Sequence, residues 1–225
     1  MSGQLFVTQD GSHSIYSKQF EVSYHSKYGA IQETQHVFID AGLLYKAEQQ
    51  KEMAILDIGF GTGLNAYMTL LEGRKRSLRI QYSAYEAFPI SNEQVRQLNY
   101  PQLLNLPNSE ALFNLLHSSE WNVPKAFYQD FTLIKYLSAF ESIQAINSFD
   151  LIYFDAFAPS AQPELWETSL LRKMYQSLKN EGVLVTYCAK GQVKRNLKEV
   201  GFEVEKLKGP PGKREMTRAI KVIDR

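Results

Sequence analysis

The chain has 225 residues, enough for one α/β domain with a modest elaboration and a sizeable buried core. Apolar residues make up 44% of the sequence, charged residues 22%, and the net charge is +1, which is typical of a globular protein and argues against a disordered one. No apolar run approaches the roughly 18 residues of a membrane span, and Met1–Gln4 do not resemble a signal peptide. We therefore expect a cytoplasmic protein with no membrane partner.

The charge is unevenly distributed along the chain. Residues 186–225 contain eleven Lys and Arg against five Asp and Glu, a surplus of +6, so the first 185 residues carry −5. Such a basic segment is either a solvated face or a surface that recruits polyanions. Cys188 is the only cysteine and lies in an apolar run, so we expect a buried, unreactive thiol. No metal site is predicted, because the histidines share no ligand spacing: His13, His25, His36 and His117.

The predicted elements begin with short strands within residues 4–28 and a helix over 30–45. From residue 53 onward, strands and helices alternate. The predicted order is strand 53–58, helix 64–72, strand 80–85, a helix beginning at Ser91, helix 108–117, strand 125–129, a short helix near 132–140, strand 149–154, helix 167–179, strand 182–188, helix 191–199, and strands 201–207 and 217–223. Alternating βα units predict a mostly parallel, doubly wound sheet, and the last two strands predict a hairpin.

The sequence therefore predicts an α/β, Rossmann-like fold with a mostly parallel seven-stranded sheet, a C-terminal β-hairpin and a small N-terminal β appendage. We expect residues 1–45 to form the appendage, with short strands and a helix packed on the core, and residues 46–225 to form the main domain. Ligands of such sheets bind at the carboxyl ends of the strands. We therefore expect the functional residues there.

The most informative motif runs from Asp57 to Asn65, where a predicted strand breaks into three alternate glycines and restarts as a helix. Glycines at a helix N-terminus let a ligand lie against bare backbone. The spacing G-x-G-x-G differs from the dinucleotide-binding G-x-G-x-x-G and resembles the first motif of S-adenosylmethionine (SAM) methyltransferases. A loop that merely turns the chain is the alternative. The resemblance implies SAM contacts from Asp57, Gly59, Phe60, Gly61, Gly63 and Asn65.

Acidic residues also follow three later strands. Glu86 ends the second strand of the alternating series, where a carboxylate can accept hydrogen bonds from the hydroxyls of a ribose. Similarity to SAM enzymes implies that Asp130 binds the adenine amino group and that Phe131 packs on its ring. Asp155 follows the strand 149–154, beside the expected position of the transferred methyl group. Each acid alone could be a helix cap, but their repetition at successive strand ends favours a site.

Three segments resemble one particular family, the tRNA 5-methylaminomethyl-2-thiouridine methyltransferase domain. They are Gly59–Asn65, the pair Asp155–Pro159 and Pro163–Trp166, and Gly209–Met216, within a resemblance that runs from about Phe20 to Ile220. Membership would imply SAM-dependent N-methylation of the 5-aminomethyl group of the tRNA wobble uridine, giving 5-methylaminomethyl-(2-thio)uridine. Many relatives also carry an FAD-dependent oxidoreductase domain. This sequence ends at Arg225, so we expect it to methylate an aminomethyl substrate that is made elsewhere.

The expected chemistry requires a neutral amine. An alkylammonium with a pKa near 10.4 needs roughly 4–5 kcal/mol to reach its neutral form at pH 7. Asp155 is the candidate catalytic residue, because a carboxylate can hold the N–H and accept its proton. We expect substrate contacts from Phe157, Pro159 and Trp166 around the base, although Trp166 could equally be a core residue. Lys213 and Arg214 are the candidates for phosphate contacts with the anticodon stem-loop, although their loop could be simply a stiff turn.

Other functions stay open at this stage. A SAM-dependent methyltransferase acting on another substrate would share the cofactor motifs. A polyamine aminopropyltransferase uses a similar fold, but its acidic pocket suits a basic C-terminal segment poorly. A non-catalytic RNA-binding module does not explain the acidic strand ends, and the glycine spacing argues against a nicotinamide dehydrogenase.

Overall fold

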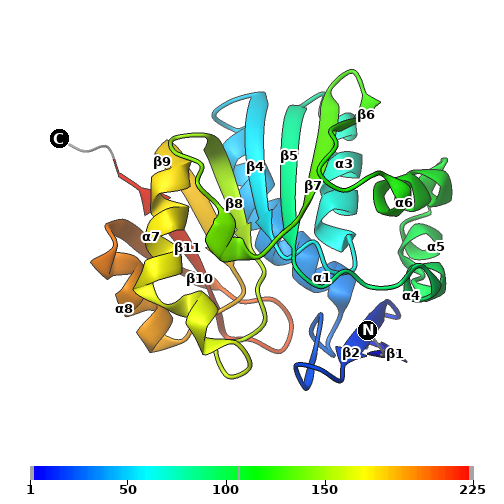
Figure 1. Ribbon diagram of the computed structural model, residues 1–225, viewed down its shortest axis with the longest axis horizontal. Helices are drawn as coiled ribbons and strands as arrows, with labels where there is room; N and C mark the ends of the chain where they lie inside the picture. Colours follow the sequence, from blue (N-terminus) through cyan, green and yellow to red (C-terminus); the bar gives the residue numbers. More distant parts are fainter. Residues whose placement is uncertain (1–2, 106, 223–225) are drawn as a thin grey trace.

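The computed structural model describes residues 3–105 and 107–222, and its centre is a mixed eight-stranded sheet (Figure 1). The strand order is β10-β11-β9-β8-β4-β5-β7-β6. The strands are β4 (Glu52–Ile58), β5 (Arg79–Glu86), β6 (Lys125–Tyr128), β7 (Phe131–Leu137), β8 (Phe149–Phe154), β9 (Leu178–Thr186), β10 (Phe202–Lys208) and β11 (Glu215–Lys221). Strands β7, β5, β4, β8 and β9 run parallel, and β10 and β11 form an antiparallel hairpin. The predicted α/β fold and C-terminal hairpin are therefore confirmed.

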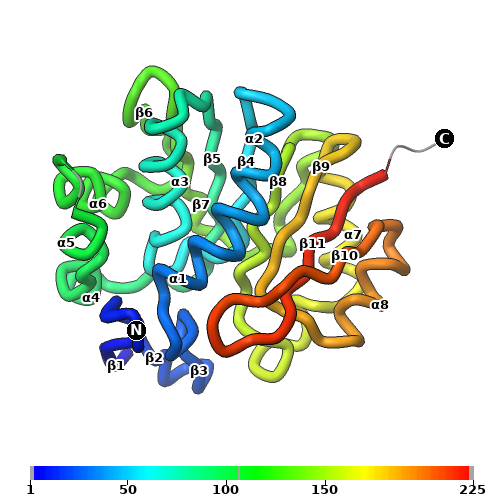
Figure 2. The backbone as a smooth tube through the Cα atoms, turned by 180° about the vertical axis from the view of Figure 1, so that it is seen from behind, coloured from blue at the N-terminus to red at the C-terminus, as the bar shows by residue number. Residues whose placement is uncertain are grey.

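Helices cover both faces of the sheet. Figure 1 shows α7 (Thr168–Ser177) and α8 (Gly191–Glu199) in front of the strands, whereas Figure 2, seen from behind, shows α3 (Leu64–Lys75) on the other face. Three further helices lie beyond β5 and β7: α4 (Asn92–Gln97), α5 (Tyr100–Leu104) and α6 (Ser109–Ser118). Among the described residues, no helix combines the length and apolar character that a membrane crossing requires.

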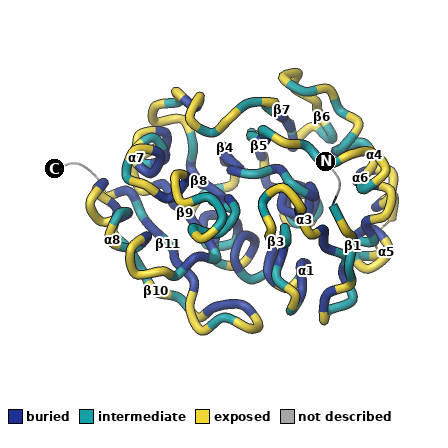
Figure 3. Tube along the Cα trace, turned by 60° about the horizontal axis from the view of Figure 1, so that its bottom comes forward, coloured by how far each residue is buried: buried dark blue, intermediate teal, exposed yellow. Residues whose placement is uncertain are grey.

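The sheet separates two hydrophobic cores, because side chains alternate between the faces of each strand. Ile55 packs in the core between the sheet and α3, whereas its neighbour Leu56 packs in the other core, against α7 and α8. Figure 3 shows the central strands β4 and β8 as buried and much of the outer helices as exposed. Strands that are buried on both faces read as continuous apolar runs, which is why their sequence predicts them well.

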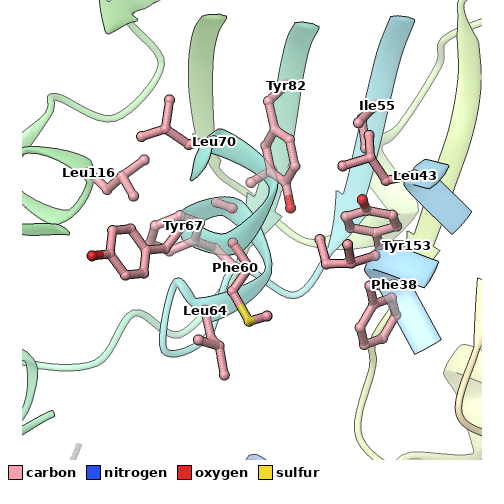
Figure 4. Packing of buried hydrophobic residues seen from close by; sticks show 14 of the residues in the cluster. Phe38, Leu43, Ile55, Phe60, Leu64, Tyr67, Leu70, Tyr82, Leu116 and Tyr153 are labelled. Carbon is pink, nitrogen blue, oxygen red and sulfur yellow. The ribbon is translucent and has the colours of Figure 1, made fainter. Parts of the chain in front are cut away.

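The N-terminal segment forms a three-stranded antiparallel sheet and then a helical stretch. The strands are β1 (Gly3–Val7), β2 (His13–Ser17) and β3 (Val22–Ser23), and the helical stretch comprises α1 (Ala30–Thr34), the π-helical η1 (Gln35–Leu44) and α2 (Tyr45–Ala47). The ring of Phe38 lies 5.2 Å from that of Tyr153 on β8 (Figure 4), so this helix belongs to the main core. The division of the chain at residue 45 stays a prediction.

One predicted element was wrong. The helix expected near 132–140 is strand β7, parallel to β5, and β6 is an antiparallel strand at the sheet edge, so the sheet has eight strands rather than seven. Lys135 hides the strand pattern, because a charged residue occupies a buried position of the alternation. Its ammonium donates to the carbonyl of His117 at 2.8 Å and lies 4.8 Å from the ring centre of Trp121. The predicted last strand reached residue 223, which lies outside the described residues; β11 ends at Lys221.

Candidate active site

A cleft of about 390 Å³ opens at the carboxyl ends of β4, β5 and β8, where the sequence places the site. We call it the main cleft. The N-terminal sheet, which lies below α1 in Figure 1, covers part of it. The lining residues used below are Phe20, Tyr24, Gly59, Phe60, Gly61, Asn65, Glu86, Phe88, Phe140, Glu141, Asp155 and Phe157.

The glycine loop forms the floor of the main cleft between β4 and α3. Gly59, Gly61 and Gly63 have φ angles of +100°, +49° and +73°, which other residues adopt only with strain. Hydrogen bonds to β5 hold the loop, since the amides of Gly59 and Phe60 donate to the carbonyl of Tyr85 at 3.1 Å. A Cβ at Gly61 would lie 3.1 Å from the Tyr24 ring, so the backbone itself must be bare there. Both features suit a ligand held against the main chain.

Glu86 ends β5 and fixes the loop from the side. Glu86 is 7% exposed, and its carboxylate accepts hydrogen bonds from the amides of Gly61 at 2.9 Å and Phe88 at 2.8 Å. Burial raises the pKa of Glu86, and the amide hydrogen bonds from Phe88, Gly61 and Ala87 counteract this rise. The carboxylate offers about four acceptor positions, so one remains beside these three amides, and the side chain lines the cleft. The group can therefore accept a hydrogen bond from a hydroxyl of a bound ribose.

Asp57 lies beneath the glycine loop rather than in the main cleft. It is fully buried, and its Oδ2 accepts a hydrogen bond from the Tyr82 hydroxyl at 2.7 Å, whereas Oδ1 has no partner. Burial raises the pKa of Asp57 to about 8, and the hydrogen bond from Tyr82 opposes this rise. This position supports the loop from below.

Asp155 follows β8 and faces the main cleft. Its Oδ2 accepts a hydrogen bond from the Asn65 side-chain amide at 2.8 Å, and the Asn65 carbonyl accepts one from the Thr34 hydroxyl at 3.1 Å. Burial and the negative charges of Glu33 and Asp57 raise the pKa of Asp155 well above its usual range, while Asn65 and Lys213 oppose the rise. Asn65 therefore orients the carboxyl that the sequence singles out as catalytic.

An aromatic wall closes the main cleft on the side of Asp155. The ring of Phe157 lies 5.1 Å from both Phe20 and Tyr24, and Phe20 lies 5.5 Å from Phe88. Phe20 lies in the turn between β2 and β3 and Tyr24 directly follows β3, and no sequence motif marks either as a site residue. Their one signal is that the family resemblance begins at Phe20.

Like Asp57, the predicted site residues Asp130, Phe131 and Trp166 lie outside the main cleft. Asp130 is at the opposite end of the sheet, where its carbonyl accepts from Ile80 at the start of β5 and its carboxylate lies 3.8 Å from Arg79. Phe131 is 4% exposed and stacks on Tyr82 in the core. Asp130 and Phe131 were misplaced because β6 was taken to be the strand that leads to the site. The parallel strand is β7, and it ends near Phe140 and Glu141, which line the cleft.

Trp166 is the third of these residues. It is 3% exposed, and its indole N–H donates to the carbonyl of Phe157 at 2.8 Å. It therefore supports the loop after β8 from behind and is a core residue, which is the alternative that the sequence left open.

A second hollow, of about 470 Å³, adjoins the loop after β8. It is lined by Ala158, Pro159, Tyr187, Cys188, Ala189, Lys190, Lys213, Arg214 and Glu215. Arg214 and Lys190 are exposed, whereas Lys213 turns inward, and its ammonium lies 2.6 Å from the carboxylate of Glu33. The second hollow thus has a basic rim, and one of its lining residues, Lys213, contacts the buried Glu33. In the described part of the chain, no group of three or more His, Cys, Asp or Glu is arranged to hold a metal ion.

Comparison with known proteins finds a matching family model, curated relatives and solved structures. A family model described as an S-adenosyl-L-methionine-dependent methyltransferase matches residues 128–222. The chain is 31% identical over 224 residues to the tRNA 5-methylaminomethyl-2-thiouridine biosynthesis bifunctional protein MnmC of Burkholderia multivorans, covering 94% of this chain and 34% of that protein. For the protein of the same name from Actinobacillus pleuropneumoniae serotype 5b, identity is 29% over 220 residues, covering 89% and 32%.

The chain therefore spans about a third of the length of the curated relatives that it matches. Among solved structures, the crystal structure of MNMC2 from Aquifex aeolicus matches with a TM-score of 0.76 and 27% identity. That match covers 97% of this chain and 70% of the other. The likeness thus includes the N-terminal sheet as well as the main sheet.

Proposed function

The chain belongs to the S-adenosyl-L-methionine-dependent methyltransferase family that includes the methyltransferase part of the MnmC proteins, and we propose that it methylates the 5-aminomethyl nitrogen of a tRNA wobble uridine. The relatives' name, which refers to tRNA 5-methylaminomethyl-2-thiouridine biosynthesis, supports this substrate. The observation that carries the proposal is the position of Asp155, at the cleft wall and within electrostatic range of both Glu33 and Lys213. We place the reaction in the cytoplasm, with the anticodon stem-loop as the bound part of the tRNA.

The main cleft fits the adenosyl part of SAM. The bare backbone of Gly59 and Gly61 lines the cleft just before α3, and Glu86 offers a carboxylate to the ribose. When bound, SAM supplies a methyl group on a sulfonium: the amine nitrogen forms the new N–C bond, and sulfur keeps the electron pair of the broken C–S bond.

Asp155 is the residue that we assign to proton transfer. The substrate amine must lose a proton before its lone pair can attack, and a carboxyl with a raised pKa accepts that proton more readily than an ordinary one. The hydrogen bond from Asn65 leaves the second oxygen of Asp155 free for the substrate N–H. Phe157, Phe20 and Tyr24 would exclude water from this end of the cleft, and exclusion of water favours the neutral amine.

The basic rim argues for RNA over a polyamine. Glu33 and Asp155 would suit a polyamine, but a free polycation would have to pass Lys190 and Arg214, which carry like charge. The same rim attracts a phosphate backbone. Pro159 lines the second hollow beside this rim and Phe157 lines the main cleft, so we keep both as substrate contacts.

The test is methylation by the purified protein with labelled SAM. Three substrates are compared: tRNA bearing 5-aminomethyl uridine, tRNA bearing 5-carboxymethylaminomethyl uridine, and spermidine. We expect label in the first alone, because the carboxymethyl group would bring an anion beside Asp155 and Glu33. Label in the carboxymethylaminomethyl tRNA or in spermidine, or none in any substrate, would overturn the proposal.

The catalytic assignment is tested by Asp155→Asn, which keeps the shape of the side chain but cannot accept a proton. We expect the turnover rate to fall about 100-fold while the Kd for SAM stays within a few fold. Asp150→Asn is the matched control: Asp150 is on β8, the strand that Asp155 follows, and its carboxylate pairs with Lys179 and the Ala54 amide near the start of β4. A mutant of Asp155 with normal turnover would remove this residue from the reaction.

A further inference from the structure

Lys213 does not point into solvent, although it lies in a basic surface loop. Its ammonium contacts Oε1 of Glu33 at 2.6 Å and lies 3.9 Å from the ring centre of Tyr187. Glu33 is 6% exposed, and its other oxygen accepts a hydrogen bond from the Ser26 amide at 2.9 Å. A cation therefore occupies a small box made of a buried carboxylate and an aromatic face, an arrangement that binds ammonium groups well.

The fold sets this arrangement, because the loop between β10 and β11 is anchored on the N-terminal segment. Gly212, at φ +82°, packs so closely on the ring of Tyr28 that a Cβ would lie 2.0 Å from it. The imidazole Nε2 of His36 lies 2.7 Å from the carbonyl of Lys208. Both contacts hold the loop against the helix that carries Glu33.

The box also lies next to the reactive end of the main cleft. The hydroxyl of Tyr187 donates to the carbonyl of Ala156, the residue after Asp155, at 2.8 Å. The charges of Glu33 and Lys213 both act on the pKa of Asp155, in opposite directions, so the three groups lie within electrostatic range. Lys213 thus presents a CH₂–NH₃⁺ group of the same chemistry as the protonated aminomethyl substituent.

We propose, resting on the proposed function, that the ammonium of Lys213 is an internal occupant of the substrate's amine site. The aminomethyl group of the nucleotide displaces it, and Glu33 with Tyr187 then holds the amine beside Asp155. Glu33 is in this sense a positioning residue for the substrate. The exchange leaves the charge inside the box unchanged, because one ammonium replaces another. The released Lys213 then adds a positive charge to the rim formed by Lys190 and Arg214.

The first experiment tests whether the box binds an amine when no methyl transfer takes place. Lys213→Met keeps much of the side-chain volume but removes the charge, so the buried Glu33 carboxylate is left without its cation. We expect about 50 mM methylammonium chloride to raise the unfolding midpoint of this variant by a few degrees over the same concentration of sodium chloride. Wild type and Lys213→Arg, which fill the box, should show no such difference. The matched control is Lys194→Met, because Lys194 pairs with Glu215, 2.7 Å away, on the far side of the loop.

The second experiment measures the competition in the assay. For the nucleoside 5-aminomethyluridine, which has no phosphate, Lys213→Met should lower KM by roughly tenfold, because the internal competitor is gone. Glu33→Gln should raise that KM with a smaller change in kcat, as expected for a residue that holds the amine. Tyr187→Phe should retain the methylammonium response in the Lys213→Met background, and Tyr187→Leu should lose it.

Two results would overturn this inference. One is a Lys213→Met variant that responds to methylammonium no more than Lys194→Met does. The other is a KM for the nucleoside that rises in Lys213→Met. Failure of the proposed function would look different: the wild type would methylate no aminomethyl uridine, while the methylammonium measurement would still decide whether the box binds an amine.

Discussion

Replacing Gly61 by valine tests whether the glycine loop holds the cofactor. At φ +49° a β-branched residue is strained, which costs about 1–3 kcal/mol of folding free energy. The new side chain would also lie within the main cleft, since its Cβ alone comes 3.1 Å from the Tyr24 ring, closer than ordinary carbon contacts. We expect the Kd for SAM to rise at least about 100-fold, which corresponds to about 2.7 kcal/mol of binding free energy.

Gly11→Val separates backbone strain from the loss of space for the ligand. Gly11 has a φ angle of +83°, but a Cβ there would meet nothing within 4 Å. Both variants should therefore lose unfolding free energy, measured with denaturant, with Gly61→Val losing at least as much because of Tyr24, and only Gly61→Val should lose affinity for SAM, measured by calorimetry. Equal affinity in both variants would refute the assignment of the loop, as would a wild-type protein that binds NADH but not SAM.

Two further predictions concern pH and salt. Burial lowers the pKa of His25 to about 4, below its value of 6.5 when unfolded, so its contribution to stability is lost as the pH falls from 6.5 toward 4. Between pH 8 and pH 5 this loss is about 2 kcal/mol, and the unfolding free energy of His25→Gln should vary with pH by that much less; an unchanged pH dependence would contradict it. Arg214→Ala should weaken tRNA binding and reduce the slope of log affinity against log salt by about one, whereas an unchanged slope would make Arg214 a solvated residue.

The sequence predicts the parts of the fold where local pattern and environment agree. Strands β4, β8 and β9 are buried on both faces, and their apolar runs identify them. Strand β7 was not predicted, because Lys135 occupies a buried position of the strand. Its contacts with Trp121 and His117 make this burial possible, and they arise from tertiary structure that no local pattern contains. The π-helical turns of Gln35–Leu44 were not predicted either, because a stripe of apolar residues predicts a helix but not which kind of helix.

The same limit applies to the site. Gly61, Glu86 and Asp155 were predictable, because parallel strands bring their carboxyl ends to one edge and the glycine spacing marks the first of them. Asp130 was misplaced because its strand was taken to be parallel. The partner of Lys213 was not predictable, because Glu33 is 180 residues away in the sequence and meets it only through the packing of the loop after β10.

The N-terminal segment explains how a common sheet acquires a particular substrate. Gly61, Glu86 and Asp155 belong to the strand ends and line the main cleft, and we propose them for cofactor binding and proton transfer. The residues that shape the other side of the reaction come from before residue 45: Tyr24 faces the glycine loop, and Glu33 holds the cation beside Asp155. Thr34 fixes Asn65, which orients Asp155, so the N-terminal helix acts on the reacting group as well. A cut at the predicted boundary of residue 45 would therefore remove half of the amine site while leaving the strand-end residues of the cofactor site in place.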